Sequence, residues 1–221
     1  MLVAVTGMQR EAKLLRGRCQ VVVAGGKNLG LGSKIEHVIA RGAHAIMSFG
    51  IAGGLDPSLQ VGDVIIASEV FSFDDELFPT DGKWLENLRA ALPDTKMGRF
   101  AGSDVLALEP MLKESFYHQS HAMIVDAESH IAARTAQQYG VPFVGIRAVS
   151  DDARQSLPPA AAFALNDEGR IDYSAVMLSL LDEPSQWRAL IRTARDTNTA
   201  MKALLRCLEL LGPGLGCPPS S

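Results

Sequence analysis

The fold follows from one stretch, Phe143-Val144-Gly145-Ile146-Arg147-Ala148-Val149-Ser150-Asp151-Asp152, an apolar run that ends abruptly in a polar cluster. A run this rich in β-branched residues, entered through Val141-Pro142, predicts a buried strand of a mostly parallel sheet. Its carboxyl end delivers Ser150 and Asp151 together, and ligands of open α/β sheets bind at the carboxyl ends of strands. The alternative interpretation is a Ser-Asp helix cap.

Short apolar runs elsewhere in the chain predict further strands, at residues 2–6, 20–24, 45–49, 61–68, 96–101 and 123–126. Helical composition separates most of these runs, at residues 9–16, 33–41, 83–92, 110–119 and 131–139. From Tyr173 the chain is predicted to be helical to residue 211, with a break at Glu183-Pro184-Ser185. The alternation of strands and helices predicts a βαβ architecture and therefore an α/β fold.

Length and composition predict a single domain. The 221 residues suffice for one sizeable core, which we expect over residues 1–211, and the Pro- and Gly-rich tail 212–221 is expected to be disordered. The net charge of −4 and the absence of a long basic run give nucleic-acid binding little support. Three scattered cysteines predict a reducing compartment without structural zinc, and the short apolar start predicts no signal peptide, so a cytoplasmic location is expected.

Carboxylates follow two of the predicted strands. Gly7 ends the first strand, and Glu11 lies in the first turns of the next helix, where it could point into a site. Asp126 and Glu128 flank a second strand-to-helix turn, where carboxylates commonly accept hydrogen bonds from sugar hydroxyls. Each of these three acids could instead be an N-terminal helix residue favoured by the helix dipole.

Two glycine-rich stretches also follow predicted strands. Residues 25–33 hold four glycines and Lys27, and their amides could bind an anion or form a flexible connector. Their spacing matches neither the Walker pattern nor the dinucleotide fingerprint. The second stretch, Gly50-Ile51-Ala52-Gly53-Gly54, would let a flat ligand lie against the backbone or let the chain turn tightly.

Five ordered motifs together resemble the nucleoside phosphorylase and nucleosidase superfamily: Gly7-Met8-Gln9-Arg10-Glu11, Phe49-Gly50-Ile51-Ala52-Gly53-Gly54, Val61-Gly62-Asp63-Val64, Val125-Asp126-Ala127-Glu128 and Arg147-Ala148-Val149-Ser150-Asp151. The chain is most similar to methylthioadenosine/S-adenosylhomocysteine nucleosidases and, closer still, to hopanoid-associated nucleoside phosphorylases. The likeness to the latter extends into Ser156-Leu157-Pro158-Pro159 and the helix over residues 192–205. It implies a three-layer αβα fold with a mostly parallel, mixed and twisted sheet flanked by helices.

The resemblance implies cleavage of the N-glycosidic bond of a purine nucleoside. Asp151 would be the general acid at purine N7, a role that requires a carboxylic acid able to hold its proton near neutral pH, and Ser150 would orient it. Glu128 and the backbone of Ala127 would hold the ribose hydroxyls, and Arg147 would support the acid from the same face of its strand. The remaining implied substrate contacts are Ser103, Leu106, Ile51, Ala52 and Gly53.

The nucleophile implied by the resemblance is either water or phosphate. Glu11 matches the carboxylate that activates water in hydrolytic members. Phosphorolytic members place an arginine and a serine where this chain has Ser48 and Ile51, so phosphate donors would have to come from Gly7, Arg10, Gly26 or Lys27.

The favoured expectation is phosphorolysis of adenosylhopane, with hydrolysis of methylthioadenosine or S-adenosylhomocysteine as the alternative. A third alternative is a nucleoside-binding protein without turnover. Ala127 replaces the usual methionine, which favours a bulky apolar 5′ substituent and an open apolar surface beside the site. No metal or cofactor is implied beyond inorganic phosphate as co-substrate. A homodimer is implied as well, and a lipid-linked substrate would entail transient membrane contact.

Overall fold

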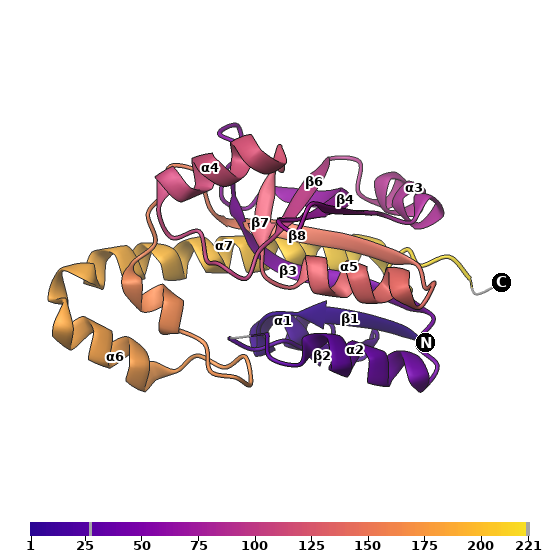
Figure 1. The fold of residues 1–221 in the computed structure, drawn as a ribbon, viewed down its shortest axis with the longest axis horizontal. Coiled ribbons are helices and arrows are strands. Elements are labelled where there is room, and N and C mark those ends of the chain that lie inside the picture. The colour runs from indigo at the N-terminus through magenta and orange to yellow at the C-terminus, as the bar shows by residue number, and fades with distance from the viewer. Residues whose placement is uncertain (27, 220–221) are drawn as a thin grey trace.

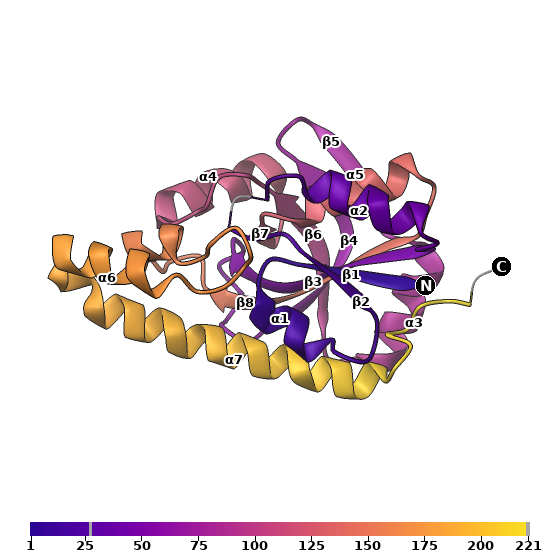
Figure 2. The ribbon, with the colours of Figure 1, turned by 90° about the horizontal axis from the view of Figure 1, so that it is seen from below.

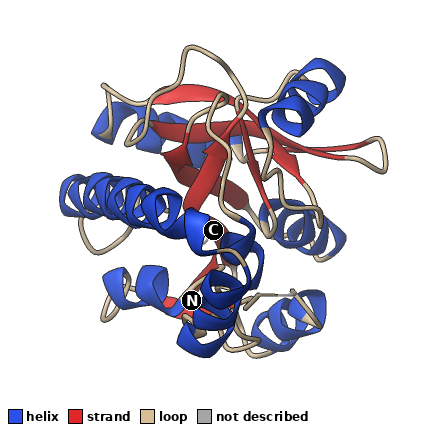
Figure 3. Cartoon of the chain, turned by 90° about the vertical axis from the view of Figure 1, so that its left-hand side faces the viewer, coloured by secondary structure: helices blue, strands red, loops and turns tan. Residues whose placement is uncertain are grey.

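The computed structural model describes residues 1–26 and 28–219 of the chain. Within them an eight-stranded sheet lies between helices (Figures 1 and 3). The strands are β1 (Leu2–Thr6), β2 (Gln20–Val23), β3 (Ala45–Gly54), β4 (Val64–Ser72), β5 (Glu76–Pro79), β6 (Lys96–Gly102), β7 (Ile124–Asp126) and β8 (Phe143–Asp151). The helices are α1 (Gln9–Leu14), α2 (Leu31–Ala40), α3 (Gly82–Ala91), α4 (Pro110–Ser120), α5 (Ser129–Gln138), α6 (Tyr173–Asp182) and α7 (Trp187–Leu211), with short 3-10 helices η1 (Pro159–Phe163) and η2 (Pro184–Gln186).

The sheet is mixed, and its strands follow the order β2-β1-β3-β7-β6-β4-β5. β8 pairs with β3 in parallel and with β4 in antiparallel fashion, so the strands β3, β8, β4, β6 and β7 form a closed circuit of pairings. The predicted α/β class, with helices flanking a mixed sheet, is therefore confirmed.

The strand β8 is the centre of the core, because all nine of its residues are buried. Phe143 and Val149 pack into one apolar cluster, whereas Val144, Ile146 and Ala148 pack into the other, on the opposite face of the sheet. A strand covered on both faces needs apolar residues at every position, which explains the continuous run in the sequence. The long helix α7 covers the second cluster and lies along one edge of the molecule (Figure 2).

Three elements differ from the expectations. β3 continues through the glycines to Gly54, whereas the predicted strand ends at residue 49. The edge strand β5 was not predicted, because four residues ending in a proline carry no alternating pattern.

The third difference is the tail, for which disorder was expected over residues 212–221. In its described part, Leu215 is fully buried and the Trp84 indole Nε1 donates to the Leu215 carbonyl over 2.9 Å. A single leucine that fills a space beside a buried tryptophan leaves no periodic signal in the sequence.

Candidate active site

A cleft lies where the carboxyl ends of β1, β3, β6, β7 and β8 converge. Its lining includes most of the residues singled out in the sequence: Gly7, Glu11, Ile51, Ala52, Gly53, Ser103, Leu106, Ala127, Glu128, Ser150 and Asp151. β1, β3 and β8 are parallel, so their carboxyl ends lie at the same edge of the sheet, and the antiparallel pairing of β7 with the end of β3 brings the carboxyl ends of β7 and its neighbour β6 to the same place. Apolar side chains complete the wall: Met8, Val105, Ala107, Val125, Leu157 and Leu165.

Glu11 enters the cleft from the first turn of α1 and is 1% exposed. Its carboxylate accepts hydrogen bonds from the backbone amides of Met8 and Ile51, each 2.8 Å long. Burial raises the pKa of Glu11, against the opposing positive charge of Arg147. A carboxylate that is fixed by two amides and has a raised pKa has the properties of a general base that works near neutral pH.

Glu128 lies at the turn between β7 and α5 and is also buried. The Arg147 guanidinium donates to its Oε2 over 2.9 Å, yet burial raises the pKa of Glu128 to about 7. Gly7 packs so closely that a Cβ atom there would lie 2.7 Å from Glu128 Oε1. A side chain at residue 7 would collide with the Glu128 carboxylate. This lack of space, more than the backbone freedom of glycine, explains why a glycine follows β1.

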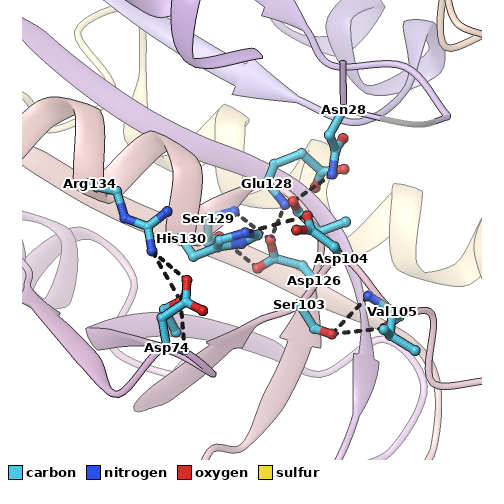
Figure 4. A network of polar contacts seen from close by, with 12 residues as sticks. Asn28, Asp74, Ser103, Asp104, Val105, Asp126, Glu128, Ser129, His130 and Arg134 are labelled. Carbon is cyan, nitrogen blue, oxygen red and sulfur yellow. Dashed lines mark hydrogen bonds and ion pairs between the residues drawn. The ribbon is translucent and has the colours of Figure 1, made fainter. Parts of the chain in front are cut away.

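Asn28 is a neighbour of this turn that the sequence did not indicate. Its Nδ2 donates to the Ala127 carbonyl over 2.7 Å, and Figure 4 shows it reaching toward the segment that carries Glu128. Asn28 has a positive φ of 51°, a conformation that asparagine adopts more readily than most residues. The loop after β2 thus supports, through a side-chain amide, the turn that carries Glu128.

Ser103 shapes the loop on the other side of the cleft. Its hydroxyl accepts a 3.0 Å hydrogen bond from the Val105 amide, so the backbone turns sharply after β6 (Figure 4). The turn leaves Val105 and Leu106 about half exposed at the rim, with relative exposures of 59% and 51%. This part of the rim is apolar.

Arg147 lies beneath the cleft and not at its surface. It is 1% exposed and donates to Ser48 Oγ over 2.7 Å, to Asp126 Oδ1 over 3.2 Å and to Glu128 Oε2. The expectation that Arg147 supports Asp151 is wrong. The two residues share a face of β8, but four residues of strand span about 13 Å, which exceeds the reach of an ion pair.

Lys113 of α4 takes the place expected for Arg147. It is fully buried, and its Nζ donates to Asp151 Oδ2 over 2.5 Å. The other carboxylate oxygen, Oδ1, accepts from the Ser150 hydroxyl over 2.7 Å. Nothing in the sequence around residue 113 distinguishes this lysine from the exposed lysines that helices usually carry.

Of the residues proposed as phosphate donors, the three in the described part of the chain, Gly7, Arg10 and Gly26, do not converge on one anion site. The amide of Gly26 donates to the Asn166 carbonyl over 2.9 Å. The turn over residues 166–169 therefore lies against the glycine-rich loop and takes up a backbone amide that an anion would need. Arg10 points away and donates to Asn198 of α7 over 2.7 Å. Gly7 lines the cleft but adjoins the Glu128 carboxylate, and Lys27 lies outside the described residues.

The described residues offer neither a metal centre nor a transmembrane helix. No group of three or more His, Cys, Asp or Glu side chains among them is arranged to hold a metal ion. In the same part of the chain, no helix combines the length and the apolar character needed to cross a membrane.

Comparison with known proteins points to one superfamily. Residues 13–182 match the family model described as the phosphorylase superfamily. A 5′-methylthioadenosine/S-adenosylhomocysteine nucleosidase of Pseudoalteromonas translucida is 29% identical over 160 residues, which is 62% of this chain and 68% of that protein. The corresponding nucleosidase of Marinomonas sp. is 27% identical over 135 residues, 51% of this chain and 58% of that protein. The chain thus aligns with about three fifths of the length of the latter.

Solved structures agree in fold. The futalosine hydrolase of Helicobacter pylori superposes with a TM-score of 0.69 at 16% identity, covering 95% of this chain and 96% of that one. The S-adenosylhomocysteine nucleosidase of Streptococcus pyogenes, in complex with 5-methylthiotubericidin, gives a TM-score of 0.68 at 16% identity, with coverages of 96% and 97%. At such low identity the likeness concerns the fold alone.

Proposed function

The chain belongs to the phosphorylase superfamily, and from this premise we propose that it is a hydrolytic nucleosidase that releases adenine from methylthioadenosine or S-adenosylhomocysteine. One observation carries the choice of hydrolysis: the cleft presents Glu11 as a buried carboxylate that is fixed by two amides. Water suits such a site, because a carboxylate can remove its proton, whereas it repels an anion.

Each acid has its own role in the proposed reaction. Asp151 gives a proton to purine N7, so that the base leaves as neutral adenine when the glycosidic bond breaks. Glu128 accepts hydrogen bonds from the ribose hydroxyls. Glu11 takes a proton from the attacking water, which adds to the anomeric carbon. Glycosidic cleavage passes through a cation-like sugar, which the carboxylates around it stabilise by their charge.

A second candidate is phosphorolysis of adenosylhopane, and the apolar rim is the observation that favours it. Val105 and Leu106 are exposed there, and Met111 at the start of α4 is 83% exposed. An apolar rim accommodates a large 5′ substituent whether water or phosphate attacks. It therefore supports nucleosides with an apolar 5′ substituent as substrates, but it does not support phosphate as the nucleophile. The homodimer, the cytoplasmic location and transient membrane contact stay predictions from the resemblance and the sequence.

The test measures adenine release by purified protein from methylthioadenosine, S-adenosylhomocysteine and adenosylhopane, with and without phosphate, and identifies the sugar product by mass. Phosphate-independent release with free methylthioribose as the product is the expected result. Release that requires phosphate and yields a ribose 1-phosphate would overturn hydrolysis. The variant Glu11→Gln keeps the shape of the side chain and is expected to lose about 100-fold or more in kcat.

A further inference from the structure

Lys113 is the one buried cation in contact with the proposed acid within the described residues, and hydrolysis as proposed above does not yet use it. Resting on that function, we propose that Lys113 is a positioning residue that stabilises the negative charge which Asp151 acquires as its proton passes to the purine.

The geometry fixes the lysine firmly. Its Nζ donates to Asp151 Oδ2 over 2.5 Å, to the Asp152 carbonyl over 2.8 Å and to the Gln155 carbonyl over 3.0 Å. Three acceptors match the three hydrogens of an ammonium group, so Lys113 is fully hydrogen-bonded as the cation. A fully satisfied, fully buried ammonium cannot swing away from the carboxylate.

Asp151 is held from two sides. Lys113 engages Oδ2, the Ser150 hydroxyl engages Oδ1, and the carboxyl group still lines the cleft. The neighbouring backbone is equally close, because a Cβ atom on Gly53 would lie 3.2 Å from Oδ2. The acid is therefore preorganised before any nucleoside binds.

The movement of the proton during glycosidic cleavage explains how Lys113 would help the reaction. The C–N bond breaks with its electron pair going to the purine, N7 takes the proton of Asp151, and Asp151 becomes a carboxylate. Lys113 keeps its own proton, and the carboxylate that forms lies beside a fixed positive charge in a site from which water is largely excluded. Charge that develops next to a preorganised ion is stabilised more strongly than in water.

A purely structural role is the competing explanation, because Lys113 also ties the segment after β8 through the Asp152 and Gln155 carbonyls. A structural role predicts equal losses for every substrate. The proposed role predicts losses only where the leaving group needs a proton, because a base that leaves as a stable anion does not use Asp151.

The experiment therefore compares methylthioadenosine with 4-nitrophenyl riboside, whose nitrophenolate leaves without protonation. Lys113→Met is expected to lower kcat for methylthioadenosine about 100-fold and to change the nitrophenyl reaction by no more than about threefold. Equal losses on both substrates would overturn the proposal.

A double variant covers the case in which an unpaired buried carboxylate prevents folding. Lys113→Met combined with Asp151→Asn removes both charges and leaves neutral groups of similar size. If Lys113 acts only through Asp151, the double variant has the same kcat for methylthioadenosine as Asp151→Asn alone, whereas a further loss contradicts the proposal. A wild-type protein that releases no adenine would instead refute the proposed function itself.

Discussion

The substitution Gly50→Ala tests the packing beneath the site. A Cβ atom at residue 50 would lie 2.4 Å from Glu11 Oε1, 2.7 Å from Glu11 Cδ and 2.6 Å from the Arg147 guanidinium. Neither neighbour is a free chain end, because Glu11 is held by two amides and Arg147 by Ser48, Asp126 and Glu128. The methyl group must therefore displace one of the two charged groups.

The magnitude follows from what is displaced. Overpacking of a tight core costs about 1–3 kcal/mol, and one hydrogen bond lost to a buried charged group costs about 1.5–3 kcal/mol. We expect Gly50→Ala to lower the free energy of unfolding by about 2–5 kcal/mol. Adenine release should fall about 100-fold, because a displacement of about 1 Å at a catalytic group has that effect.

Urea denaturation and adenine release measure the two effects on the same protein. The matched control is Gly32→Ala in α2, where an added Cβ atom would make only ordinary contacts of 3.9 Å with Ile131 and Thr135. The control should be slightly more stable than wild type, by about 0.5–1 kcal/mol, and fully active. If Gly50→Ala behaved like its control, the role assigned to the contact between Gly50 and Glu11 would be refuted.

Three further predictions concern stability. Because burial raises the pKa of Glu128 from 4.5 to about 7, folding favours its protonated form, and the free energy of unfolding should fall by about 3 kcal/mol between those pH values. Glu128→Gln should flatten that dependence in urea titrations at several pH values, and an unchanged slope contradicts the assignment. Leu204→Ala in α7 should cost about 2–5 kcal/mol because Leu204 is fully buried, whereas Leu205→Ala at a 41% exposed neighbour should cost far less. Leu215→Ala should cost about 2 kcal/mol by emptying the space beside Trp84, whereas a disordered tail would show no change.

The sequence allowed the central strands to be predicted because their physical signal is local. β8 is buried on both faces, and every position from Phe143 to Val149 except Arg147 is apolar or small. The acids of the site could be located for a similar reason, since Glu11, Glu128 and Asp151 each follow the end of such a strand. These inferences need only the order of residues and the rule that strand ends converge.

What the sequence could not supply was contact between distant segments. Lys113 reaches Asp151 across 38 positions, and the amide of Gly26 meets a carbonyl 140 residues further along the chain. Arg147 was assigned to the correct face of its strand but to the wrong carboxylate, since it donates to Glu128 and not to Asp151. Alternation along a strand predicts which face a side chain is on, but it does not predict how far that side chain lies from another on the same face. Register and packing decide such pairs, and neither is encoded within a few residues of the groups involved.

The charges of the site show why water and phosphate are not equivalent here. Arg147 is shared among Asp126 and Glu128, with which it makes ion pairs, and Glu11, whose charge it offsets from nearby. Burial raises the pKa values of Glu11 and Glu128, and the one guanidinium that they share with Asp126 does not outweigh their loss of solvation. A phosphate ion would add a further negative charge to a buried cluster that already holds its protons tightly. A sugar that becomes cation-like as its base departs has the opposite effect, because it stabilises the ionised forms of the same carboxylates. The electrostatics of the cleft therefore suit a cation-like transition state, and they support the proposed hydrolysis because they disfavour the binding of a phosphate ion.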